Sequence, residues 1–133
     1  MYSFGSKSAE RLETIHPDLQ IILVEGIKKI NFTIIFGFRN QAEQDLAFRK
    51  KRSKVQWPNS KHNQSPSLAV DVAPWPLDWN DLSRFYYLAG IFMGIAHSKG
   101  IGLRFGGDWD MDGELTDNTF NDLGHFELTG SIK

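Results

Sequence analysis

The chain of 133 residues contains no cysteine. This absence excludes disulfide bonds and thiolate ligands, so any metal site must use histidine and carboxylate side chains. An excess of charge of either sign is also absent, because acidic and basic residues nearly balance and the formal net charge is -1. That value excludes a broad basic surface of the kind that binds nucleic acid or anionic lipid. The basic run Arg49–Arg52 is the exception, and we interpret it as a solvated helix end and loop in preference to a polyanion site.

Long apolar stretches are missing as well. None is long enough to cross a bilayer, so we expect no membrane insertion. The first residues lack the apolar segment of a secretory signal, which predicts synthesis in the cytoplasm and another route to any target outside it. The length and the absence of repeats or linkers predict a single domain over residues 1–133.

Helix and strand patterns do not alternate regularly along the chain, which favours the α+β class. The predicted helices are a short one capped by Ser8, one from Pro17 through Ile27, one over Gln41–Arg49, and one over Asp81–Lys99 capped by Asn80. The predicted strands are Phe32–Phe38, Leu68–Ala73, Ile101–Phe105 and Gly124–Leu128. Two long loops, Lys50–Ser67 and Gly106–Leu123, lie between them, and loops of that length are usually functional or mobile.

Three side chains that can bind metal border these loops. His62 lies in the first loop, Asp71 interrupts the apolar run of residues 68–73, and His125 lies in an otherwise apolar strand. Taken singly, each of two residues has another interpretation. Asp71 is explained equally well as an edge-strand residue facing water, and His125 as a hydrogen-bonded core histidine. Together they offer two imidazoles and a carboxylate, which suits a zinc ion with one coordination position left open for hydrolysis.

Two further side chains could act on a substrate beside such an ion. Asp122 could take a proton from an attacking water and pass it to a leaving amine. Arg39 follows a predicted strand and could stabilise an oxyanion, although an ordinary surface salt bridge explains it equally well. Glu127 could orient His125 from the side away from the metal, or be solvated.

A separate acidic segment contains Asp108, Asp110, Asp112 and Gly113. This spacing reproduces the first half of a calcium-binding loop, but Thr119 stands where that loop has its bidentate glutamate. A weak Ca²⁺ site and a solvated acidic loop both remain open.

The motifs Ser60-x-His62, Ala69-x-Asp71 and Asp122-x-x-His125 together resemble the S-x-H, A-x-D and [ED]-x-x-H signature of zinc peptidases that include D-alanyl-D-alanine carboxypeptidases and dipeptidases. Within that group the chain is especially similar to small phage endolysins of the L-alanyl-D-glutamate peptidase type. The similarity covers most of the chain, in segments 37–44, 60–74, 79–82, 103–109 and 122–128.

The resemblance implies that His62, Asp71 and His125 bind Zn²⁺, that Asp122 is the catalytic base, and that Arg39 contacts an oxyanion or a substrate carboxylate. It also implies a small α+β fold of the hedgehog and D-Ala-D-Ala peptidase type, with an antiparallel sheet flanked by helices. The implied reaction is hydrolysis of the L-Ala–D-Glu bond in the peptide stems of bacterial peptidoglycan. We further expect a monomer that is made in the host cytoplasm and reaches the cell wall through a holin-type pore.

Two departures from the pattern matter. His62 and Asp71 are nine positions apart, which is wider than in many relatives, so the intervening loop should bulge at the cleft rim. The base is Asp122, where D-alanyl-D-alanine enzymes typically have glutamate, and this favours the L-alanyl-D-glutamate type. The alternatives are a D-alanyl-D-alanine carboxypeptidase of the same fold and a non-catalytic, metal-stabilised wall-binding module.

Overall fold

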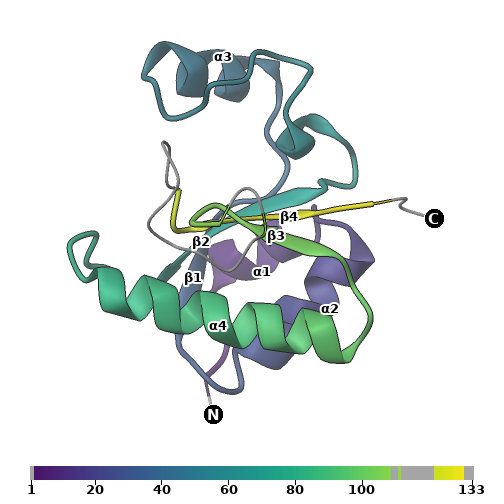
Figure 1. The fold of residues 1–133 in the computed structure, drawn as a ribbon. Helices are drawn as coiled ribbons and strands as arrows, with labels where there is room; N and C mark the ends of the chain where they lie inside the picture. The colour runs from purple at the N-terminus through teal and green to yellow at the C-terminus, as the bar shows by residue number, and fades with distance from the viewer. Residues whose placement is uncertain (1, 109–110, 112–121, 131–133) are drawn as a thin grey trace.

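The computed structural model describes residues 2–108, 111 and 122–130. Within these residues, four strands form one antiparallel sheet in the order β1-β2-β4-β3. The strands are β1 (Phe32–Phe36), β2 (Ala69–Pro74), β3 (Leu103–Phe105) and β4 (His125–Leu128). Helices α1 (Ser6–Leu12), α2 (Pro17–Gly26) and α4 (Leu82–Ser98) lie on one side of this sheet (Figure 1). The predicted α+β fold with an antiparallel sheet flanked by helices is therefore confirmed.

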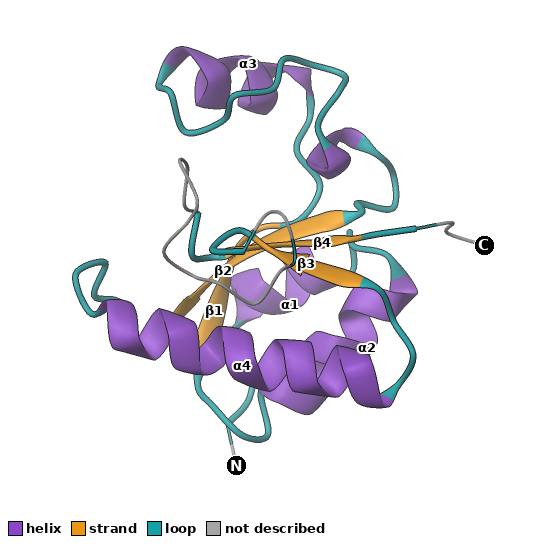
Figure 2. Ribbon diagram, in the orientation of Figure 1, coloured by secondary structure: helices purple, strands orange, loops and turns teal. Residues whose placement is uncertain are grey.

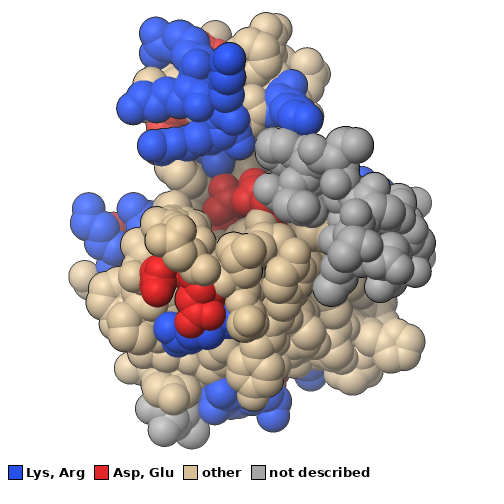
Figure 3. Space-filling model, turned by 60° about the vertical axis from the view of Figure 1, so that its left-hand side comes forward, with Lys and Arg blue, Asp and Glu red and all other residues tan. Residues whose placement is uncertain are grey.

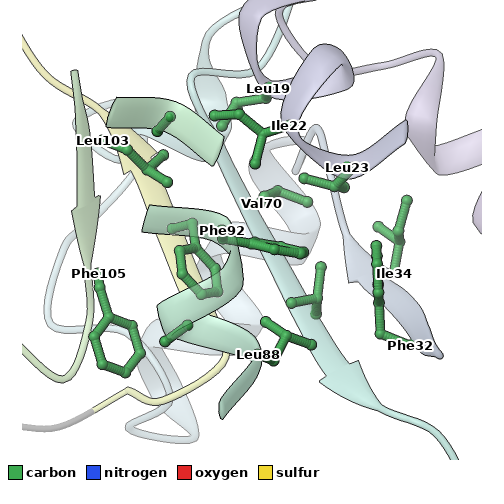
Figure 4. Close-up of a cluster of buried hydrophobic side chains, with 14 of the residues drawn as sticks. Leu19, Ile22, Leu23, Phe32, Ile34, Val70, Leu88, Phe92, Leu103 and Phe105 are labelled. Carbon is green, nitrogen blue, oxygen red and sulfur yellow. The ribbon is translucent and has the colours of Figure 1, made fainter. Parts of the chain in front are cut away.

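The two faces of the sheet differ in chemistry. Successive side chains of a strand point to opposite faces, so Val70 and Val72 of β2 and Phe126 of β4 enter the core against α2 and α4. Figure 4 shows the buried cluster around Val70 and Phe92. Phe92 of α4 also packs on Phe126, with ring centroids 4.9 Å apart. The alternate positions, Asp71 and His125, face the other side. The polar residue inside the apolar run of β2 therefore belongs to the opposite face of the sheet.

The opposite side carries α3 (Gln41–Arg49) and the 3₁₀ turn η1 (Lys61–Asn63), which form a lobe above the sheet (Figures 1 and 2). Asn40 starts α3 with a capping box: its side chain accepts from the Glu43 N–H, and the Glu43 side chain accepts from the Asn40 N–H. The turn η1 falls inside the segment that the sequence predicts as loop. The candidate ligand His62 is thus fixed by a hydrogen-bonded turn, capped by Ser60.

Two predicted caps are wrong. Helix α1 begins after Gly5, and Ser8 lies within it, buried, with its hydroxyl near Thr33 Oγ1 and accepting from the Ile34 N–H. Helix α4 is capped by Asp81, which accepts from the Arg84 N–H, and not by Asn80. Tertiary contacts with β1 hold Ser8 inside α1, whereas at α4 two neighbouring residues have similar cap preference and Asp81 makes the bond.

Strand ends also differ by a few residues from the predicted ones. Strand β1 ends at Phe36, which pairs with Asp71 after a register shift between Ile34 and Phe36. Strand β2 extends to Pro74, which is paired with Phe32. None of the helices in the described part of the chain is long and apolar enough to cross a membrane.

Candidate metal centre

His62, Asp71 and His125 meet on the polar face of the sheet. They come from η1, β2 and β4, and one ligand atom from each lies within 4.8 Å of the others. Asp71 and His125 are direct partners across the β2–β4 ladder. The antiparallel register therefore brings together two residues that are 54 positions apart in the chain.

His62 has one nitrogen in a hydrogen bond and the other available. Its Nδ1–H donates to the Gly37 carbonyl over 2.8 Å, because a carbonyl oxygen can only accept. In the neutral ring Nε2 carries the lone pair, and this nitrogen lies 3.3 Å from Asp71 Oδ2. This atom is buried and has no hydrogen-bond partner among the described residues. A buried nitrogen with a free lone pair beside a carboxylate fits a metal ligand whose orientation is fixed from behind.

His125 is held between two carboxylates. Nδ1 lies 3.0 Å from Asp71 Oδ1, and Nε2 lies 2.9 Å from Glu127 Oε1. Burial opposes a charge on this ring, but the hydrogen bonds to Asp71 and Glu127 outweigh it and raise the pKa of His125 to about 10. The pocket therefore favours positive charge at this position. A metal ion on Nδ1 can replace the proton there.

The pKa values of the two carboxylates beside His125, Asp71 and Glu127, are lowered, whereas that of His125 is raised. Burial would raise the pKa of Asp71, but the neighbouring imidazoles of His62 and His125 hold it well below its usual range. Burial also opposes ionisation of Glu127, yet the hydrogen bond and charge of His125, with the charge of Lys61, lower its pKa to about 2. Lys61 and Arg104 contact Glu127 at 3.1 and 3.5 Å. Glu127 is thus an anchored carboxylate behind His125 and not a solvated one.

Arg39 is a buried partner of the same group. Its side chain is 7 % exposed, and Nη2 lies 2.9 Å from Asp71 Oδ2. Nη1 donates to Gln44 Oε1 over 3.1 Å, and the guanidinium lies 4.6 Å from the centre of the Phe36 ring. An ordinary surface salt bridge is therefore excluded for Arg39.

Sequence reasoning missed the polar residues that hold Arg39 in place. Gln44 is fully buried, and Asn63 donates both to the Arg39 carbonyl and to Gln44 Oε1. Gln44 also donates to the Val55 carbonyl, which ties α3 to the following loop. A buried glutamine on a short helix leaves no distinct sequence signal beyond its position after Arg39.

Two glycines allow the backbone to close around the site. A Cβ at Gly124 would lie 2.3 Å from the Val72 carbonyl oxygen, and one at Gly106 would lie 2.1 Å from the Asp122 carbonyl oxygen. These close approaches fix the chain on either side of His125, since Gly106 N–H donates to the His125 carbonyl and Asp122 N–H to the Gly106 carbonyl. Only glycine fits at either position without a backbone shift.

Asp71 opens onto a cleft of about 570 Å³ that Phe36, Arg39, Trp79 and Asp122 also line. The two imidazoles are 2 % and 8 % exposed, so Asp71 is the candidate ligand that lines this cleft. Burial and the negative charge of Asp71 raise the pKa of Asp122. The geometry thus brings the candidate base to the same cleft as the candidate ligand Asp71.

Asp108, the described carboxylate of the predicted calcium loop, does not line this cleft. Asp108 forms an isolated antiparallel bridge with Phe105 and lines a different pocket, with Tyr86, Met93 and Phe105. Asp110 and Asp112 lie outside the described residues. The Ca²⁺ site stays a prediction.

Residues 1–129 match the family model described as phage L-alanyl-D-glutamate peptidase. The chain belongs to this family. It is 33 % identical to the L-alanyl-D-glutamate peptidase of Escherichia phage T5 over 96 % of its own length and 98 % of that protein. It also superposes on the crystal structure of the Serratia marcescens L-Ala D-Glu endopeptidase ChiX with a TM-score of 0.77, 27 % identity, and coverage of 95 % and 89 % of the two chains. The family resemblance drawn from the sequence motifs is confirmed.

The donor set fits zinc in its chemistry. Two imidazoles and one carboxylate are ligands that Zn²⁺ accepts, and each imidazole is held from behind by an oxygen acceptor. The structure establishes a site that can hold a metal ion, while the identity of the ion and the roles of the five site residues stay predictions.

Proposed function

We propose that the chain is a zinc-dependent peptidase that hydrolyses the L-Ala–D-Glu bond of bacterial peptidoglycan stems. The observation that carries this proposal is the grouping of His62, Asp71 and His125, with Asp71 and the candidate base Asp122 lining one cleft. Membership of the L-alanyl-D-glutamate peptidase family supports the choice of bond. Zn²⁺ would be held by His62 Nε2, an Asp71 oxygen and His125 Nδ1.

When bound, zinc supplies a Lewis acid that polarises the scissile carbonyl and makes water a stronger acid. Asp122 takes the proton from the attacking water and delivers it to the departing amine of D-Glu. Burial strengthens Asp122 as a base, since it raises the pKa of the carboxyl. Arg39 lines the same cleft and provides positive charge where the carbonyl oxygen becomes negative.

Trp79 adds an apolar wall to the cleft. It stacks on Phe85 with ring centroids 5.6 Å apart and remains 57 % exposed. A large exposed ring held in this way is suited to contact the aliphatic part of a peptide stem.

The decisive experiment compares the wild type with Asp122→Ala on purified peptidoglycan and on a soluble stem peptide. We expect the wild type to release new amino termini on D-Glu, and the variant to lose about 10²–10⁴-fold in kcat while it still binds the wall and one zinc ion. Free D-Ala as the product would instead identify a D-alanyl-D-alanine carboxypeptidase. Wall binding without hydrolysis by the wild type would identify a binding module.

We also propose that residues 1–133 act as a single catalytic domain and as a monomer. Synthesis in the host cytoplasm with release to the wall through a holin-type pore belongs to the same proposal. Light scattering gives the oligomeric state. Lysis that depends on co-expression of a pore-forming protein tests the route.

A further inference from the structure

Two cations lie at the candidate active-site cleft and have no role in the mechanism above. Lys51 and Arg52 line the same cleft as Asp71 and Asp122. Both side chains are exposed, and neither forms an ion pair with another residue of the described part of the chain. Figure 3 shows Lys and Arg side chains gathered over the lobe that carries α3, above a hollow with acidic side chains.

The backbone at Lys51 is unusual for a lysine. Its φ is 60°, in the left-handed region that favours glycine. The Lys51 N–H donates to the Phe48 carbonyl and the Arg52 N–H to the Ala47 carbonyl. This is the Schellman ending of a helix, in which glycine is the common residue at the position of Lys51. A cationic side chain thus stands at the cleft where the local backbone alone would favour glycine.

The third cation of the cleft is already engaged. Arg39 contacts Asp71 with one terminal nitrogen and Gln44 with the other. Arg39 is assigned to Asp71 and to the reacting carbonyl, so Lys51 and Arg52 are the two cleft cations of the described residues that have no assigned partner.

The substrate of the proposed reaction carries a matching charge. Glutamate has two carboxyl groups and only one can continue the peptide, so the residue after the scissile bond bears a second carboxylate unless it is amidated. We propose that Lys51 and Arg52 bind this carboxylate and make the enzyme selective for stems whose D-Glu is not amidated. The inference rests on the proposed function and adds to it a preference between two natural forms of the same stem.

Two synthetic stem peptides test the proposal. They share the L-Ala–D-Glu bond and differ only in the second carboxyl of D-Glu, which is free in one and a primary amide in the other. We expect wild-type kcat/KM to be about 10- to 100-fold higher for the free carboxylate, since one or two exposed charge-assisted contacts are lost with the amide. Added salt should reduce this difference, because exposed charges are screened.

Variants at Lys51 distinguish the effect of losing a positive charge from the effect of losing stability. Lys51→Gly and Lys51→Asn both accept a left-handed backbone, so their unfolding midpoints should equal or exceed that of the wild type. Each should lose about tenfold in kcat/KM on the carboxylate peptide, mainly through KM, and little on the amide. Arg52→Gln should behave in the same way. Lys50→Gln is the matched control, because Lys50 is exposed and does not line the cleft.

The outcomes are distinct. Equal wild-type rates on the two peptides would overturn the inference and leave the proposed function standing, whereas cleavage of neither peptide would remove the proposed function. Equal losses by the variants on both peptides would also overturn the inference. The inference would also be overturned if the variants lost activity on intact peptidoglycan but on neither peptide. That result would point to an anionic wall polymer as the ligand.

Discussion

Asp71 Oδ1 and His125 Nδ1 lie 3.0 Å apart across two paired strands. The contact joins the carboxylate to one ring nitrogen of His125, while Glu127 holds the other. The site therefore keeps a positive charge between carboxylates, either as a proton or as a metal ion. Several measurable properties depend on this arrangement.

Removal of the charge on Glu127 should weaken metal binding. Glu127→Gln loses the carboxylate that accepts from His125 Nε2. Zinc affinity should therefore fall about 10- to 100-fold, which is the usual effect of removing a residue that orients a metal ligand. Competition with a chromophoric chelator measures this affinity. Glu25→Gln, which alters an exposed pair with Lys28, is the control and should bind zinc as the wild type does. Unchanged affinity in Glu127→Gln would show that Glu127 does not support the ligand.

Zinc binding should release roughly one proton per chain at pH 7. His125, with a pKa of about 10, carries this proton in the metal-free protein, and Nδ1 must lose it to bind metal. Calorimetric titration in buffers of different ionisation enthalpy counts the protons. His125→Ala should show neither this release nor tight binding.

The raised pKa of His125 also sets the pH dependence of stability without metal. The folded state holds a proton that the unfolded chain releases near pH 6.5, so its contribution is complete below pH 6.5 and is lost as the pH rises towards 10. The free energy of unfolding of the metal-free protein should therefore decrease across this window, as measured by urea denaturation at several pH values. The same decrease in His125→Ala would contradict this assignment.

Arg39 should stabilise the metal-free protein more than the zinc-bound one. Arg39→Met leaves the half-buried Asp71 carboxylate without its guanidinium partner, which should cost about 3 kcal/mol. Zinc supplies positive charge to the same carboxylate, so saturating metal should restore part of this loss. Denaturation with and without zinc tests both statements, and an equal loss in the two states would contradict the second.

Gly124 should tolerate no side chain. Gly124→Ala would place a Cβ 2.3 Å from the Val72 carbonyl oxygen, so β2 and β4 must separate where Asp71 and His125 meet. We expect a loss of about 1–3 kcal/mol together with weaker zinc binding. Gly94→Ala is the matched control, because Gly94 is exposed on α4 with open space around it, and it should stabilise the helix by about 0.5–1 kcal/mol.

The sequence alone determined the family, the α+β class and the identity of the candidate site residues. Their paired motifs are specific even though His62, Asp71 and His125 are each ambiguous singly. The alternation of side chains along β2 and β4 also follows from the sequence, because a strand places every second residue on the same face.

Only the tertiary structure decided how these residues are held. Strand register places His125 opposite Asp71. The turn η1 positions His62 so that its ring donates to the Gly37 carbonyl, a contact that no sequence motif predicts. The burial of Arg39 likewise depends on contacts with Gln44 of α3 and Asn63 of η1, which lie elsewhere in the chain. The basic run that composition suggested was a solvated helix end contains two residues that line the cleft. Contacts between segments far apart in the chain set these features, and local sequence preference carries no information about such contacts.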